Sequence, residues 1–83
     1  PVISRFLGIV ITMLWNDHAP PIFSEVGEFE ITVEIETGIV EGKFPPRALR
    51  HVLEWRELHK NELMNDWDLC RQAEMPNPIQ PLE

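Results

Sequence analysis

The feature that most constrains this sequence is a run of strictly alternating apolar and polar residues between positions 28 and 36. Its apolar members are Phe29, Ile31, Val33 and Ile35, and every residue between them is glutamate or threonine. Successive side chains of a β-strand point to opposite faces, so a period of two predicts a strand with one buried and one solvated face. Such a strand belongs to an antiparallel sheet that is covered on one side.

Shorter strand signals flank this run. Residues 8–15 are rich in β-branched and apolar residues at both odd and even positions, that is, on both faces of a strand. This pattern predicts a central strand buried on both faces. Further strands are expected at residues 22–26 and 39–43, with turns at Gly27-Glu28 and Thr37-Gly38. The sequence therefore predicts an antiparallel meander of three or four strands within residues 6–43.

A helical region is expected to follow the sheet. Proline suits the first turn of a helix because its missing N–H needs no partner there, so we place the start near Pro46. Counted at 100° per residue along one straight helix, residues 46–73 carry a single apolar stripe that could cover the sheet. The stripe comprises Leu49, Val52, Leu53, Leu63, Met64, Trp67 and Cys70.

Two large side chains, Trp55 and Leu58, fall outside this stripe. That mismatch, with Asn61 as a candidate N-cap, predicts a kink or break between His59 and Glu62. One bent helix and two short helices both remain open. The tail, residues 75–83, contains three prolines and is expected to be extended. The fold class is thus α+β, in a single domain spanning residues 1–83.

Charge, cysteine content and the length of the apolar runs bear on the binding partners and the location of the protein. The net charge of −7 repels phosphate and argues against direct binding to nucleic acid. Cys70 is the only cysteine, so no intrachain disulfide forms, and a reducing cytoplasm is the expected location. The longest apolar run, residues 6–15, is shorter than the roughly 20 residues that span a bilayer, so no membrane association is expected.

Chemistry could reside in the loop Asp17-His18-Ala19-Pro20-Pro21. Proline-stiffened loops often hold functional sites, and His18 could act as a general base with Asp17 as its orienting partner. A histidine in a turn also commonly caps backbone groups. A catalytic role for His18 and Asp17 and a structural one both remain open.

Two other groups suit a partner protein better than a reaction. The carboxylates of Glu28, Glu30, Glu34 and Glu36 project from one strand face about 6.6 Å apart, too far to share a metal ion, but suited to a basic surface. The alternative is a solvated face that suppresses aggregation. We place Glu30 and Glu34 among the candidate binding residues.

The second group is the helix flank His51-Trp55-His59-Glu62, aligned by spacings of four, four and three. His51 and His59 lie about 12 Å apart along the axis and cannot bind one metal ion together. Trp55, Leu58 and His59 are candidate binding residues, although the flank could equally pack on the sheet edge or the tail. Neither a metal nor another cofactor is expected.

Several segments together resemble one known family. They are Ser-Arg-Phe-Leu-Gly-Ile at 4–9, Asp-His-Ala-Pro-Pro at 17–21, Leu-Glu-Trp at 53–55, and Leu-His-Lys-Asn-Glu-Leu at 58–63 with Trp67 and a closing Pro-Leu. They are similar to the bacterial family called domain of unknown function 4160. The resemblance implies a small cytosolic protein, often encoded beside another small domain in what resembles a toxin–antitoxin pair.

The sequence departs from the family at two positions. There the two prolines are commonly followed by His-Phe-His, which would give a loop with three histidines, whereas this chain has Ile22-Phe23-Ser24. Only His18 remains of that cluster. Replacing two titratable groups by an apolar and a neutral one favours binding over catalysis.

The leading hypothesis is therefore a non-catalytic protein-interaction module, one half of a toxin–antitoxin-like unit with a small protein partner. The competing hypothesis is a small hydrolase or ribonuclease-type toxin that uses His18. A homodimer is also considered, through the helix flank rather than the acidic strand, because paired glutamates would repel.

Overall fold

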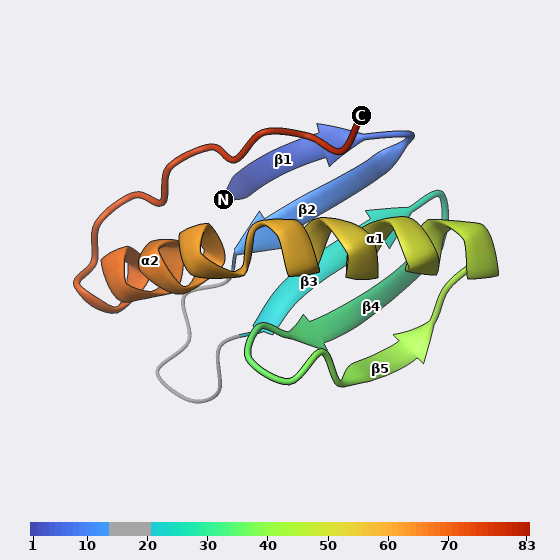
Figure 1. The fold of residues 1–83 in the computed structure, drawn as a ribbon, viewed down its shortest axis with the longest axis horizontal. Helices are drawn as coiled ribbons and strands as arrows, with labels where there is room; N and C mark the ends of the chain where they lie inside the picture. Colours follow the sequence, from blue (N-terminus) through green and yellow to red (C-terminus); the bar gives the residue numbers. More distant parts are fainter. Residues whose placement is uncertain (14–20) are drawn as a thin grey trace.

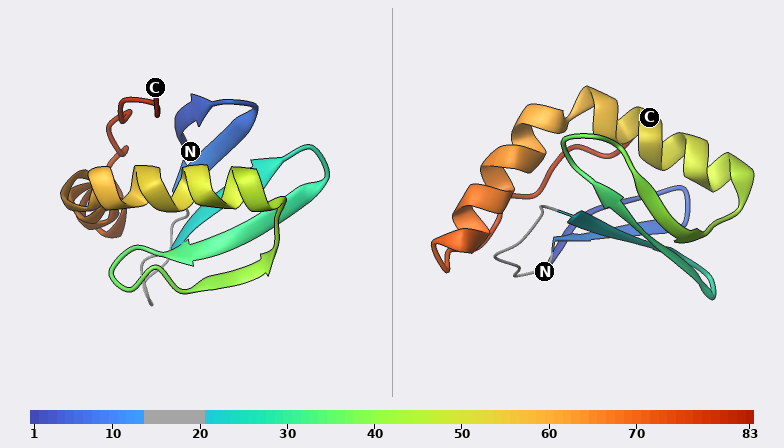
Figure 2. Two further views of the ribbon diagram at one scale, coloured as in Figure 1. Left: turned by 45° about the vertical axis from the view of Figure 1, so that its right-hand side comes forward. Right: turned by 90° about the horizontal axis from the view of Figure 1, so that it is seen from below.

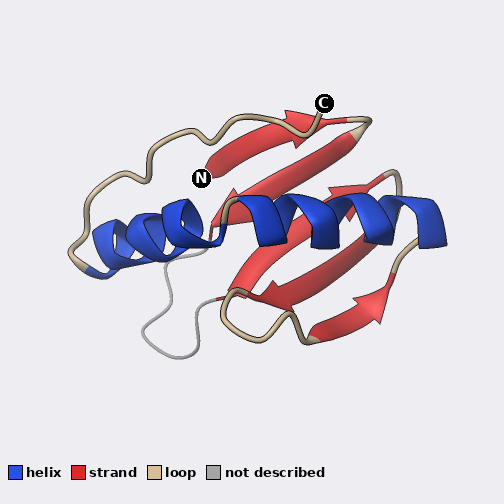
Figure 3. Ribbon diagram, viewed as in Figure 1, coloured by secondary structure: helices blue, strands red, loops and turns tan. Residues whose placement is uncertain are grey.

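A computed structural model describes residues 1–13 and 21–83 of the chain. One antiparallel sheet has the strand order β1-β2-β3-β4-β5, and two helices follow it (Figure 1). The strands are β1 Val2–Phe6, β2 Ile9–Met13, β3 Pro21–Val26, β4 Phe29–Glu34 and β5 Val40–Lys43. Both helices lie on the same side of the sheet (Figures 2 and 3). The α+β meander is confirmed, with five strands instead of three or four.

The additional strand comes from the N-terminal hairpin. Leu7 and Gly8 both have positive φ, 52° and 78°, which is the geometry of a tight turn between antiparallel strands. Phe6 consequently pairs with Ile9, and the sheet begins at Val2 instead of residue 6. The strand expected within residues 8–15 is found as β2, with a neighbouring strand on each side, but the expected burial on both faces is wrong, because only one face is fully buried. The turn at Leu7 and Gly8 lies at the start of a continuous apolar run, so the hydrophobic pattern gave no sign of it.

The middle of the sheet follows the predicted pattern. Val26 pairs with Phe29, which confirms the Gly27-Glu28 turn. Ile31, Val33 and Ile35 are almost completely buried, as their alternation predicted. β5 pairs with β4 through residues 40–43 and closes the meander.

The helical region is two helices, α1 Pro46–Leu58 and α2 Lys60–Arg71. The predicted break is confirmed, but His59 is the N-cap of α2, and Asn61 lies inside the helix. Each helix has its own buried stripe, with Val52, Trp55 and Arg56 in α1 and Leu63, Asp66 and Cys70 in α2. Both stripes follow the i, i+3, i+4 or i+7 spacing of an amphipathic helix.

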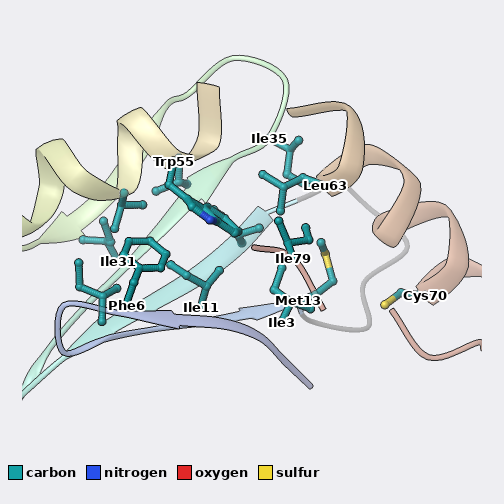
Figure 4. Close-up of a cluster of buried hydrophobic side chains, with 14 residues drawn as sticks. Ile3, Phe6, Ile11, Met13, Ile31, Ile35, Trp55, Leu63, Cys70 and Ile79 are labelled. Carbon is teal, nitrogen blue, oxygen red and sulfur yellow. The ribbon is translucent and has the colours of Figure 1, made fainter. Parts of the chain in front are cut away.

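The core lies between the sheet and these stripes (Figure 4). Trp55 is at its centre, with its ring 5.5 Å from that of Phe6. The tail is extended, as predicted, and it contributes to the same core because Ile79 is buried there. The Ile79 N–H donates to the carbonyl of Ile3 at 2.8 Å, which ties the tail to β1. Neither described helix is long and apolar enough to cross a membrane.

Candidate functional site

The face of the sheet opposite the helices is covered by neither α1 nor α2 (Figure 2). Strand register places Arg5, Val10, Glu25, Glu30 and Lys43 side by side in one row across all five strands. Cross-strand neighbours share a face, and Ser24 and Ile31, the adjacent pair, are buried beneath the helices. The row therefore faces away from the helices.

A second row gives this face an apolar centre. Thr12, Phe23 and Thr32 are neighbours on β2, β3 and β4, and all three side chains are half-buried although neither α1 nor α2 covers them. Glu41 continues the row on β5, and Glu34 lies one row further along β4. We call this surface, made of the two rows and Glu34, the open face. It has a Phe-Thr-Val centre, and around it lie four carboxylates and two basic residues, Arg5 and Lys43.

The charges on the open face are poorly balanced. Glu25 and Glu30 are directly opposite each other on β3 and β4, and such pairs have Cβ atoms about 5 Å apart. Within the described residues neither carboxylate forms an ion pair. Lys43 is the cross-strand neighbour of Glu30, whereas Glu25 has Val10 on its other side. Glu25 thus carries an uncompensated like-charge contact.

Substitution of Glu25 by glutamine is expected to stabilise the protein by about 0.2 to 1 kcal/mol, because it removes the repulsion and retains the side-chain shape. Urea unfolding at low ionic strength measures the change. Glu41→Gln is the matched control, since Glu41 faces Thr32, and its effect should be close to zero. A destabilised Glu25→Gln variant would show that the carboxylate has a favourable partner.

The helix flank differs from the sequence prediction. Of the two alternatives for Trp55, packing on the tail is the one found, and the candidate binding role is not supported, because its exposed fraction is 0%. Its Nε1–H donates to the carbonyl of Gln80 at 2.8 Å, and its ring lies 5.4 Å from that of His59. Trp55 is therefore a core residue beneath the tail and offers no contact surface.

Leu58 and His59 remain at the surface of the junction between the helices. Leu58 is 66% exposed, as expected. His59 is half-buried, and its Nδ1 lies 2.6 Å from Oε1 of Glu62, so the predicted spacing does bring these two together. Leu58 and His59 line a shallow pocket of about 440 Å³ with the end of the tail. This junction is on the helix side of the sheet, so it is separate from the open face that carries Glu30 and Glu34.

The proposed catalytic pair, His18 and Asp17, lies outside the described residues. The two positions that depart from the family pattern are described: Ile22 and Ser24 are both completely buried on the helix-covered face. Among the described residues, the Ser24 hydroxyl has no hydrogen-bond partner. Among residues 1–13 and 21–83, no three histidine, cysteine, aspartate or glutamate side chains gather closely enough to hold a metal ion.

Cys70 is buried against the core. Burial raises the pKa of its thiol above the usual range, and the nearby carboxylate of Asp66 adds to the rise. The thiol is therefore protonated at neutral pH, and the nucleophilic thiolate is scarce. Cys70 is a packing residue.

Comparison with known proteins gives one match. The family model described as domain of unknown function (DUF4160) matches residues 8–68, which cover most of the sheet and both helices. No curated protein and no solved structure matches the chain.

Proposed function

The chain belongs to the family described as domain of unknown function (DUF4160), and from this we propose that it is a small non-catalytic interaction module, one component of a two-protein unit of toxin–antitoxin type. The pairing with a second small protein, the bacterial cytoplasm as its location and the toxin–antitoxin context come from the family resemblance. The observation that carries the binding role is the open face, with its half-buried Phe23 and its surrounding carboxylates.

The open face specifies the chemistry of the partner. Glu25, Glu30, Glu34 and Glu41 would meet lysine and arginine side chains, while an apolar side chain of the partner covers Phe23. Aromatic centres surrounded by polar groups are typical of the energetically important part of an interface. The partner is therefore a protein with a basic rim and an apolar anchor. Nucleic acid does not meet this description, because its phosphates would be repelled.

The size of the open face suits a compact partner. Five strands spaced about 4.8 Å apart, the longest of which have six residues, cover at most roughly 20 Å by 20 Å. The projected area of about 400 Å² is half of what one side of a standard interface buries, so the contact needs the rim as well as the centre. Carboxylates on that rim accelerate association with a basic partner and make it sensitive to salt.

Capture from a lysate of the native host, with matched variants, tests the proposal. The open-face variant Glu30→Lys/Glu34→Lys is expected to lose a basic protein that the wild type retains. Glu54→Lys/Glu74→Lys changes the net charge equally on exposed positions of α1 and the segment after α2, and it should retain that protein. Circular dichroism confirms that both variants fold. Equal retention by the two variants, or equal loss, would contradict a role for the open face.

A further inference from the structure

A second feature lies on the helix side of the protein, away from the open face. An open pocket of about 290 Å³ lies between α2 and the tail. Its polar lining comes from Asn61, Glu62, Asn65 and Asp66 of α2 and from Asn77 of the tail. Neither lysine nor arginine lines it. Two carboxylates and three amide side chains therefore surround the pocket without a cation among its lining residues.

Asp66 is the unusual member of this set. It lies on the buried stripe of α2, between Leu63 and Cys70, and only 1% of it is exposed. Its Oδ1 accepts the backbone N–H of Asn77 at 2.9 Å. Its Oδ2 is buried and has no donor within hydrogen-bond distance among the described residues. A buried carboxylate oxygen without a donor is costly, so a structural role alone does not explain it.

The electrostatics of Asp66 agree with this geometry. Burial raises the pKa of the carboxyl above its usual range, the Asn77 N–H opposes the rise, and the charge of Glu62 adds to it. Glu62 is itself held beside His59 at the N-terminus of α2. A positive group placed against Oδ2 would relieve both the desolvation and the repulsion between the two carboxylates.

The walls of the pocket are held in place. Pro76 and Pro78 flank Asn77 and restrict its backbone, and the Ile79 N–H is bonded to the carbonyl of Ile3. The carbonyl of Gln80 accepts the indole N–H of Trp55. The Asn77 N–H is thereby fixed on Oδ1, which leaves Oδ2 as the free acceptor.

We propose that this pocket binds a primary ammonium group. The ammonium donates one hydrogen bond to Oδ2 of Asp66 and the others to the amide oxygens of Asn61 and Asn65. An ammonium presents three donors from a single point charge and needs only one free carboxylate oxygen. A guanidinium prefers both oxygens of a carboxylate, and Oδ1 already has a donor. Asn61 and Asn65 line the same pocket and are exposed, so their side chains are free to turn toward a bound ammonium.

The ammonium can come from a lysine side chain of a polypeptide or from a small free amine. Two probes distinguish these sources: Nα-acetyl-lysine N-methylamide, which presents the side chain, and n-butylammonium chloride. Each is titrated into the ¹⁵N-labelled chain, and the Asn77 amide resonance reports on Asp66. We expect a saturable shift in the millimolar range with the lysine derivative. Saturation with butylammonium alone would assign the site to free amines.

Three comparisons make the test specific. Asp66→Asn removes the charge and keeps an oxygen for the Asn77 N–H, and it should weaken binding at least tenfold. Asp68→Asn makes the same change in charge on a more exposed position of α2 and should leave affinity unchanged. Nα-acetyl-arginine N-methylamide should bind at least tenfold more weakly than the lysine derivative. No saturable shift with either amine, or equal binding by Asp66→Asn, would overturn the proposal, and equal affinity for arginine would overturn its ammonium selectivity.

Discussion

Trp55→Ala is expected to remove a large part of the protein's stability. The indole is completely buried, packs against Phe6 and holds the tail through its bond to the Gln80 carbonyl. Removing a buried tryptophan costs about 3 to 5 kcal/mol. At about 0.05 to 0.15 kcal/mol per residue, a chain of 83 residues has a total stability of only about 4 to 12 kcal/mol.

Urea unfolding followed by circular dichroism measures this loss. Leu58→Ala is the matched control, because Leu58 lies three residues further along and is mostly exposed, and its cost should stay within about 0.5 kcal/mol. Similar, small effects of both substitutions would mean that Trp55 is not in the core. The two variants also distinguish two causes of lost binding. Trp55→Ala would lose binding through unfolding, whereas Leu58→Ala would lose it only if the exposed side chain contacts the partner.

Arg56→Ala is expected to have the second largest effect, a loss of about 2 to 4 kcal/mol. The Arg56 side chain is only 9% exposed. Its Nε–H donates to the carbonyl of Ile35 at 2.9 Å and its Nη2 donates to the carbonyl of Glu36 at 2.8 Å. Truncation leaves the carbonyl of buried Ile35 without this donor and releases the turn between β4 and β5 from α1.

Glu57→Ala is the control for Arg56. Glu57 accepts a bond from Nη1 of Arg56 at 3.0 Å, but its side chain is 76% exposed, so the pair should contribute less than about 1 kcal/mol. Arg56→Lys should recover little stability, because an ammonium cannot reproduce the two donors of the planar guanidinium. Full stability of Arg56→Lys in urea would show that charge alone matters at this position.

The strands that alternate cleanly could be predicted from the sequence, and the first hairpin could not. In β4 the pattern and the structure agree at Ile31 and Val33, which are buried, but not at Phe29, which is 44% exposed at the start of the strand. In the first hairpin, apolar residues continue through the turn. Leu7 adopts a positive φ there, which is uncommon for leucine and so could not be expected from the residue type. The open face was predicted through Glu30 and Glu34, but Phe23 at its centre depends on strand register.

The helices show a different reason for error. Treating residues 46–73 as one straight helix gave a single stripe that excluded Trp55, whereas the break at His59 gives α1 and α2 separate axes and separate stripes. Counted separately, Val52, Trp55 and Arg56 share one face. The same count places Asp66 on the buried face of α2 with Leu63 and Cys70. The sequence therefore contained one sign of the pocket beside Asp66, namely a carboxylate among the apolar residues of a buried stripe.

Binding of a basic partner by the open face is tested most directly by calorimetric titration of the captured, purified partner. We expect Glu30→Lys/Glu34→Lys to weaken binding at least tenfold, or about 1.4 kcal/mol, while Glu54→Lys/Glu74→Lys stays within about twofold of the wild type. Added salt should weaken binding by the wild type more than by the open-face variant. Equal affinities of the two variants at every salt concentration would contradict binding by the open face.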